Sequence, residues 1–185
     1  GFTASQQERK RAREIIYNLA DYNPTTEPAS PFYNSTTITN DDASPTLAGK
    51  WTLVYTDAPD ITGLDAGGPL ATAKLGRIGQ ECKPPYIKNV IEWQRPDWAE
   101  FLPFAGTDES RVLQKVVTEA SASPDKPLLV NLKLAGFEVT SPLSNSTMGN
   151  LQEDIQKVGL PAAWFSRNPI KLQGPLTAPF GQFEV

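Results

Sequence analysis

The amino-acid sequence predicts a mainly β domain that begins with one α-helix and contains a second, short helix. Apolar residues recur at helical spacing near the N-terminus, and from residue 50 onward they alternate at the period of two that β-strands show. The 17 proline residues are spread along the chain, which favours short elements joined by turns. This pattern is typical of a β-sandwich or a β-barrel.

The composition excludes several classes of function. The 185 residues suffice for one domain, and the formal charge of −4 argues against a nucleic-acid partner. The chain has no histidine and one cysteine, Cys82, which excludes histidine-based triads, histidine or cysteine-rich metal sites and an intrachain disulfide. No run of about 18 apolar residues is present to span a membrane. We therefore predict a protein that is not an enzyme and needs neither metal nor cofactor.

Residues 1–23 are predicted to form the N-terminal helix. Ser5 and Glu8 have the spacing of a capping box, and an apolar stripe runs from Ala12 to Leu19. Four basic residues lie mostly off that stripe: Arg9, Lys10, Arg11 and Arg13. We expect the stripe to pack on the β-domain. The alternative is a helix that lies on an anionic membrane surface.

Residues 24–46, which are rich in proline, threonine, serine and asparagine, are predicted to be an irregular loop, and residues 47–185 the β-domain. Its predicted strands are 50–56, 86–93, 112–120, 128–134 with a continuation at 137–139 after a turn at Gly136, and 180–185. The third of these also fits a helix, and its β-branched residues favour a strand. Residues 57–76 are glycine-rich and predicted to be a mobile loop. A short helix is expected over residues 148–158, with Gly159 as its C-cap.

The first predicted strand opens with Gly49, Lys50 and Trp51, a Gly-x-Trp opening typical of lipocalins. In such an opening the indole of Trp51 plugs one end of a small barrel, and Leu53 and Tyr55 share its inward face. A buried tryptophan in an ordinary core fits the same motif.

Over residues 47–58 the sequence resembles the opening of the plastid lipid-associated (fibrillin) family, with Asp57 where that family often has serine. Further similar segments follow in the expected order at residues 20–24, 75–80, 89–90 and 179–185. The family pattern continues into one more strand after Val185. The predicted barrel therefore lacks its closing strand, or that strand lies beyond this sequence.

The resemblance implies a lipocalin-like antiparallel β-barrel preceded by an α-helix. It also implies a plastid location at thylakoids or plastoglobules, and binding or transport of a hydrophobic isoprenoid or lipid such as a quinone or carotenoid. A structural coat or interaction protein of lipid particles without an internal ligand is the alternative. An enzyme that uses aspartate or glutamate is a third, more distant hypothesis.

Aromatic side chains distributed over strands and loops are the candidate ligand-binding residues, because apolar ligands need concave apolar walls. These candidates are Trp51, Tyr55, Trp93, Phe101, Phe104, Phe137, Trp164 and Phe165. Each of them also fits a packed core. The Pro-broken stretch 98–104 fits a mouth loop, a membrane-dipping tip or a loop folded onto the barrel. The Tyr55 phenol is a candidate hydrogen-bond partner for a ligand head group.

Overall fold

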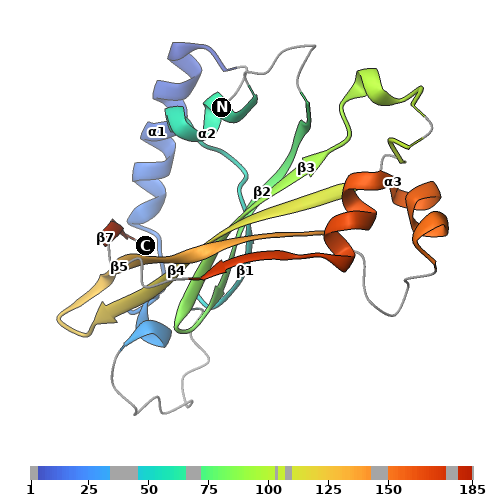
Figure 1. Cartoon of the computed structure of the whole chain (residues 1–185). Helices are drawn as coiled ribbons and strands as arrows, with labels where there is room; N and C mark the ends of the chain where they lie inside the picture. Colours follow the sequence, from blue (N-terminus) through green and yellow to red (C-terminus); the bar gives the residue numbers. More distant parts are fainter. Residues whose placement is uncertain are drawn as a thin grey trace.

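The computed structural model describes residues 4–33, 46–65, 72–102, 104–106, 110–142, 150–173 and 179–184. Within these residues, one antiparallel sheet of seven strands forms the body of the molecule (Figure 1). The strands are β1 (Gly49–Thr52), β2 (Lys74–Lys83), β3 (Tyr86–Gln94), β4 (Arg111–Ser123), β5 (Lys126–Thr140), β6 (Ile170–Gln173) and β7 (Pro179–Glu184). The α-helices are α1 (Gln6–Ala20), α2 (Pro59–Thr62) and α3 (Leu151–Arg167), and short 3-10 helices are η1 (Ser30–Phe32), η2 (Gly63–Asp65) and η4 (Asp97–Ala99).

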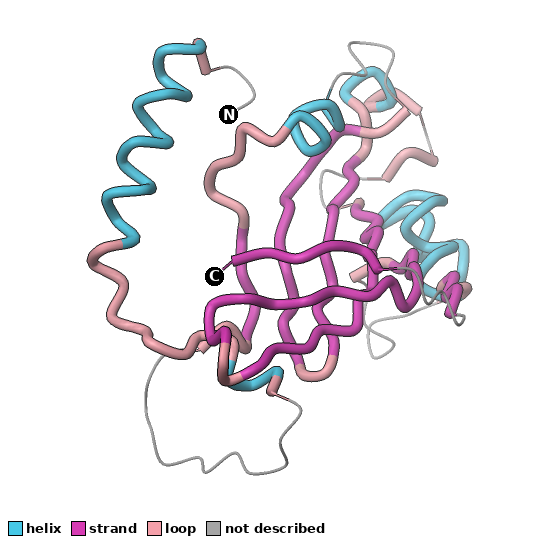
Figure 2. Tube along the Cα trace, turned by 90° about the vertical axis from the view of Figure 1, so that its left-hand side faces the viewer, coloured by secondary structure: helices cyan, strands magenta, loops and turns pink. Residues whose placement is uncertain are grey.

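The sheet is not closed into a barrel, so the mainly β class is confirmed and the lipocalin-like barrel is not. Strands β1 to β5 pair in chain order, and β6 and β7 both pair with β5. The 15 residues of β5 leave room for two partners: β6 pairs with its C-terminal half and β7 with its N-terminal half. Among the described residues, β1 pairs with β2 alone, so the sheet has two free edges where a barrel would have none (Figure 2).

The two faces of the sheet differ in charge. On one face, Lys115 of β4 contacts Glu81 of β2 (Nζ to Oε2, 3.0 Å), and Lys88 of β3 contacts Glu138 of β5 (Nζ to Oε1, 3.0 Å). Each ion pair therefore spans an intervening strand. Successive side chains point to opposite sides, so the opposite face carries Ile87, Ile91, Trp93 and Phe137, with the polar residues Asn89 and Gln114 between them. We call this second face the apolar face.

The core lies at one end of the apolar face, beside the β2–β3 and β4–β5 turns. The segment that holds η1 packs there, and the Leu47 amide N donates to the carbonyl O of Pro28 (2.8 Å). Ile87 and Val130 are fully buried, and the Thr118 hydroxyl donates to the carbonyl O of Ile87 (2.8 Å). The buried cluster comprises Ala29, Phe32, Leu47, Cys82, Ile87, Ala120, Ala122 and Val130.

Helix α1 begins where the sequence predicts. The Ser5 hydroxyl accepts from the Glu8 amide N and the Glu8 carboxylate accepts from the Ser5 amide N, which is a complete capping box. No residue of α1 is buried, and Figures 1 and 2 show the helix standing to one side of the sheet. Arg13 forms an ion pair with Asp57. The packing of the helix through its apolar stripe stays a prediction.

Neighbouring backbone approaches Gly79 and Gly136 closely. A Cβ atom on Gly79 would lie 2.4 Å from the carbonyl O of Trp51, and one on Gly136 would lie 2.2 Å from that of Leu172. The predicted loop over residues 57–76 is too long, because it contains α2 and η2 and strand β2 begins at Lys74. Gly136 lies inside the continuous strand β5 and not in a turn. The strands predicted over 86–93, 112–120 and 180–185 are present.

Trp51 does not plug a barrel end. It is 50% exposed, and its indole N–H donates to the carbonyl O of Leu47 (2.7 Å). Leu53, predicted to share its inward face, is 40% exposed. These side chains therefore stay partly exposed beside the open edge of the sheet.

Replacement of Gly136 by alanine should lower the free energy of unfolding by roughly 1–3 kcal/mol, because β5 and β6 must separate to admit the methyl group. Urea denaturation measures the change. The matched control is Gly63→Ala, since Gly63 has a helical φ of −72° and nothing within 4 Å of an added Cβ. Equal stabilities of the two variants would contradict the close approach of the strands.

Cys82 should react slowly with thiol reagents in the native protein. Burial raises the pKa of its thiol to about 11, so the group is neutral at pH 8, and the side chain is 3% exposed. Labelling with a chromogenic disulfide at pH 8 should be at least about 100-fold slower than in urea-unfolded protein. Equal rates would show that the core around Cys82 is open.

Candidate functional site

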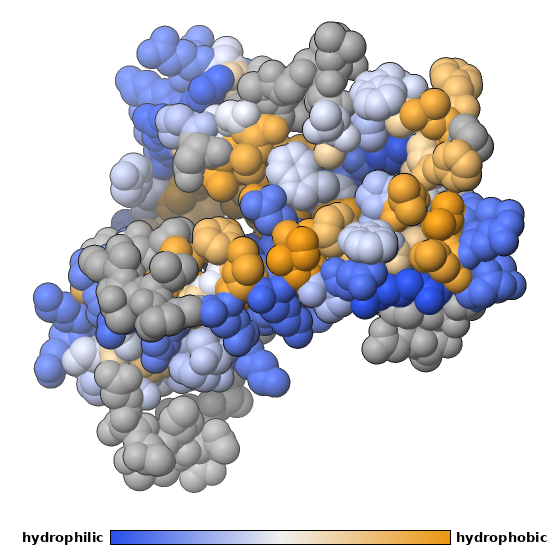
Figure 3. All heavy atoms as spheres, viewed as in Figure 1, coloured by the Kyte–Doolittle hydropathy of each residue, from blue (hydrophilic) through white to orange (hydrophobic). Residues whose placement is uncertain are grey.

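A cavity of about 950 Å³ lies where the C-terminal end of β3 and the N-terminal end of β4 approach α3. Trp93 and Val112, which are directly paired across these strands, contribute the sheet side of its wall. The described lining residues are Leu64, Thr72, Ala73, Trp93, Gln94, Arg95, Pro96, Trp98, Ala99, Leu102, Phe104, Ala105, Ser110, Val112, Leu160 and Pro161. Figure 3 shows apolar side chains across the middle of the molecule and around its α3 end.

The loop after β3 is fixed to both the sheet and α3. Arg95 Nη1 donates to the carbonyl O of Gly106 (3.1 Å) and lies 3.4 Å from that of Glu100. The Leu160 amide N donates to the carbonyl O of Phe104 (2.9 Å). The Arg95 guanidinium and the backbone bond to Leu160 therefore hold the loop beside the cavity.

Two glycines make the contact between this loop and α3 possible. Gly106 and Gly159 have φ values of +77° and +79°, which favour glycine. A Cβ atom on Gly159 would lie 2.6 Å from the carbonyl C of Ala105, and one on Gly106 would lie 2.3 Å from that of Val158. Gly159 is therefore a kink inside α3 and not the C-cap of a helix ending at residue 158. After the kink, Leu160 and Pro161 line the cavity.

Helix α3 is held by an ion pair across its kink. The Asp154 carboxylate, 2% exposed, pairs with Arg167 in the last turn. The side chain of Asn150 caps the N-terminus by accepting from the Glu153 amide N (2.9 Å). The buried pair places both halves of the helix relative to each other and thereby positions Leu160.

The cavity wall offers apolar contact and few polar groups. The Trp93 indole N–H already donates to Gln114 Oε1 (2.9 Å), and Gln94 Nε2 to Glu92 Oε1 (3.1 Å). Arg95 is the one charged side chain among the described lining residues. In the part of the chain that the structure describes, no cluster of potential metal ligands is found. This chemistry suits an apolar ligand with at most a small polar group.

Of the predicted binding residues, the structure brings Trp93 and Phe104 together in the cavity wall. Phe101 lies on the loop over the cavity and is 88% exposed. Trp164 follows Leu160 by one helical turn on α3 and is half-exposed, and Phe165 is partly buried on the same helix.

The other predicted residues lie outside the described cavity wall. Phe137 is on the apolar face, directly paired with Val116 and 37% exposed. The Tyr55 hydroxyl oxygen is buried and has no hydrogen-bond partner among the residues that the structure describes. With Trp51, these residues stay candidates for ligand contact beyond the cavity.

Several cavity residues were missed from the sequence, among them Leu64, Ala73, Val112 and Leu160. They come from separate segments and have no motif in common. The one local signal was the Gly159-Leu160-Pro161 sequence, since a glycine and a proline two residues apart favour an interruption of a helix.

The family model PAP_fibrillin matches residues 1–185. The chain belongs to this family of plastid lipid-associated proteins. The PAP/fibrillin family is a structural, plastid-associated family that is not known for catalysis. Comparison with curated proteins and with solved structures returned no match. Among the described residues, no helix has the length and apolar character needed to cross a membrane.

Asp154→Asn should destabilise the protein by roughly 3 kcal/mol, because it leaves Arg167 facing a neutral group in a largely buried site. The control is Asp97→Asn, which removes a pair with Lys74 whose Asp97 side chain is 83% exposed and should cost less than about 1 kcal/mol. Thermal unfolding of both variants measures the difference. Similar losses would mean that the α3 pair does not hold the kink.

Proposed function

We propose that this protein binds one long apolar lipid of isoprenoid type, such as a quinone or a carotenoid, in the cavity beside α3. The proposed setting is a thylakoid or plastoglobule surface within the plastid. The apolar cavity of about 950 Å³ carries this proposal. Membership of a plastid lipid-associated family supports the class of ligand.

The size and walls of the cavity suit such a ligand. Ligand pockets typically measure roughly 300–1,000 Å³ and combine apolar walls with a few polar groups. Trp93, Trp98 and Phe104 offer flat aromatic surfaces, and Arg95 and Ser110 offer polar atoms at the wall. Apolar burial contributes roughly 25 cal/mol per Å² before the costs of binding. The affinity for a prenyl chain should therefore rise with chain length, up to the longest chain that the cavity can hold.

The apolar face provides a continuation for a ligand longer than the cavity. Trp93 and Val112 line the cavity, and Ile91, Val116 and Phe137 follow on the same face of the sheet. All three of the latter are partly exposed. A prenyl tail that leaves the cavity would run along these side chains toward the closed core.

The alternative function is a coat or interaction protein of lipid particles without an internal ligand. The exposed apolar residues at the cavity mouth support it, since Trp98, Phe101 and Phe104 are 51%, 88% and 66% exposed. Exposed apolar patches mark membrane or protein interaction sites. The two functions differ in one measurable respect: only the lipid carrier should bind a small apolar molecule saturably in the cavity.

Tryptophan fluorescence should be quenched saturably by a short-chain plastoquinone analogue, because Trp93 and Trp98 line the cavity. Ala73→Phe and Leu64→Trp, which fill the cavity from two different segments, should each weaken binding at least about tenfold. Val54→Phe enlarges a side chain that is 95% exposed and should leave affinity unchanged. Binding should not vary between pH 6 and 8, since the chain has no histidine.

Saturable quenching that the two cavity-filling variants leave intact would place the ligand elsewhere. Absence of saturable quenching with quinones and carotenoids, together with retained binding to lipid vesicles, would favour the coat protein. Melting temperatures of the variants, compared with that of Val54→Phe, separate loss of the site from loss of the fold.

A further inference from the structure

The mouth of the cavity beside α3 is bordered by apolar side chains. Trp98, Leu102, Phe104 and Leu160 line the cavity, and they are also 51%, 51%, 66% and 48% exposed. Phe101 on the same loop lies outside the described cavity wall and is 88% exposed. We call these five residues the mouth patch. They lie at the α3 end of the molecule, where Figure 3 shows apolar side chains gathered, and exposed patches of this kind mark interaction sites.

The loop side of the mouth patch carries no positive charge, since residues 96–106 contain neither lysine nor arginine. Their two acidic residues are Asp97, which forms an ion pair, and Glu100. The preceding Arg95 directs its guanidinium to the carbonyl O of Gly106 (3.1 Å), within the loop itself. Apolar burial, and not charge, is therefore what a contact through this loop depends on.

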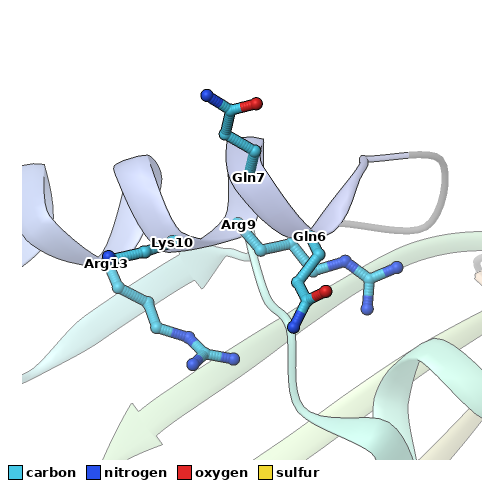
Figure 4. A pocket seen from close by; sticks show the side chains of 5 residues that line it. All are labelled: Gln6, Gln7, Arg9, Lys10 and Arg13. Carbon is cyan, nitrogen blue, oxygen red and sulfur yellow. The ribbon is translucent and has the colours of Figure 1, made fainter.

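The run of basic residues between positions 9 and 13 lies on α1, away from the mouth patch. Figure 4 shows Gln6, Arg9 and Arg13 on the side of α1 toward the strands, while Gln7 points away. A hollow of about 750 Å³ lies along this helix. Helices α1 and α3 lie on opposite sides of the sheet in Figures 1 and 2. Contacts through the mouth patch and through the basic helix can therefore be told apart by separate substitutions.

The backbone of the loop suits a lipid environment. The carbonyl O of Pro96 accepts from the amide N of Ala99 (3.0 Å), that of Ala99 from Leu102 (3.0 Å), and that of Leu102 from Ala105 (3.1 Å). Each bond joins residues three apart, so the loop is a succession of tight turns. Polar backbone groups inside an acyl layer must be paired within the protein. Turns also present no strand edge for a peptide to extend, so these bonds favour lipid over an added strand as the partner.

We propose that the mouth patch enters the acyl layer of a lipid surface, so that the ligand cavity opens directly into that layer. This docking rests on the proposed binding of an apolar lipid, whose transfer through water is costly. A mouth that faces acyl chains lets the ligand enter without leaving an apolar environment. A second copy or another protein seated on the same patch would cover the mouth, so continuity with the cavity selects lipid as the occupant. Phe101, the most exposed residue of the patch, enters deepest.

Flotation with vesicles of phosphatidylcholine, which has no net charge, tests the docking in the whole chain. The protein should float, and raising the salt from about 0.05 M to about 0.5 M should leave the bound fraction unchanged, because salt screens charges and not apolar burial. Phe101→Ser should reduce partitioning at least about tenfold, since a phenylalanine side chain that leaves water contributes roughly this factor or more. Phosphatidylcholine brominated on its acyl chains should quench the fluorescence of Phe101→Trp more strongly than that of the wild type.

Matched variants separate the mouth patch from other surfaces. Val54→Ser changes an aliphatic side chain that is 95% exposed on the segment after β1, and Lys10→Gln/Arg11→Gln removes two exposed charges of α1. Both should float like the wild type. Phe101→Ser should keep its melting temperature and, without vesicles, its saturable quenching by the plastoquinone analogue, because Phe101 lies outside the described cavity wall. Ala73→Phe should lose that quenching and still float, so the docking and the ligand proposal can fail separately.

Wild-type protein that does not float, or a Phe101→Ser variant that floats normally, would overturn the docking. Loss of flotation in Lys10→Gln/Arg11→Gln would do the same and assign the contact to α1. A wild-type dimer that Phe101→Ser converts to a monomer in light scattering would identify a second copy as the partner of the patch. Flotation that depends on Phe101 in a protein that binds no quinone would support the docking surface and contradict the proposed ligand.

Discussion

The packing of the η1 segment and Leu47 on one end of the apolar face is the contact on which the rest of the structure depends. Phe32 reaches the sheet where β4 presents the small side chains of Ala120 and Ala122, so the large aromatic ring fits without separating the strands. Full burial of such a side chain contributes roughly 1.5–3 kcal/mol. Because Leu47 lies two residues before β1, the same contact places β1 on the edge of β2. This end of the face is closed by the chain itself, and the remainder is left open toward α3.

The strand register links this core to the candidate site. Ile87 in the core and Trp93 in the cavity wall are on the same face of β3, six residues apart, and the charged residues Lys88 and Glu92 lie on the other face. A slip of one residue would move these charges onto the apolar face and Trp93 away from the cavity. The ion pairs that span a strand, Lys115 to Glu81 and Lys88 to Glu138, oppose such a slip. The interactions of the charged face thus preserve the site on the apolar face.

Some helices and strands are determined by their own local sequence, and apolar alternation and capping residues predicted these correctly. The β-branched residues of β4 and the Ser5 capping box are of this kind. The start of strand β2 was hidden because Gly76 was counted with the glycine-rich loop 57–76, and the close approach of the Trp51 carbonyl O that requires glycine at position 79 comes from another segment. The open sheet and the cavity could not be predicted, because both arise from contacts between distant segments. The Gly106–Gly159 contact joins residues more than fifty positions apart, and nothing in either local sequence indicates the other.

The sequence of the N-terminal helix does not predict what its apolar stripe contacts. A stripe of this width fits a helix packed on a sheet and a helix lying on lipid equally well. The structure adds the position of the helix beside the sheet (Figure 1) and its ion pair with Asp57. Arg13 pairs with Asp57, so by helix geometry Ile15 is turned away from that contact, whereas Ile16 lies about 60° from Arg13 and borders it. Positive charge is concentrated on α1, while the described cavity wall contains Arg95 as its one charged residue.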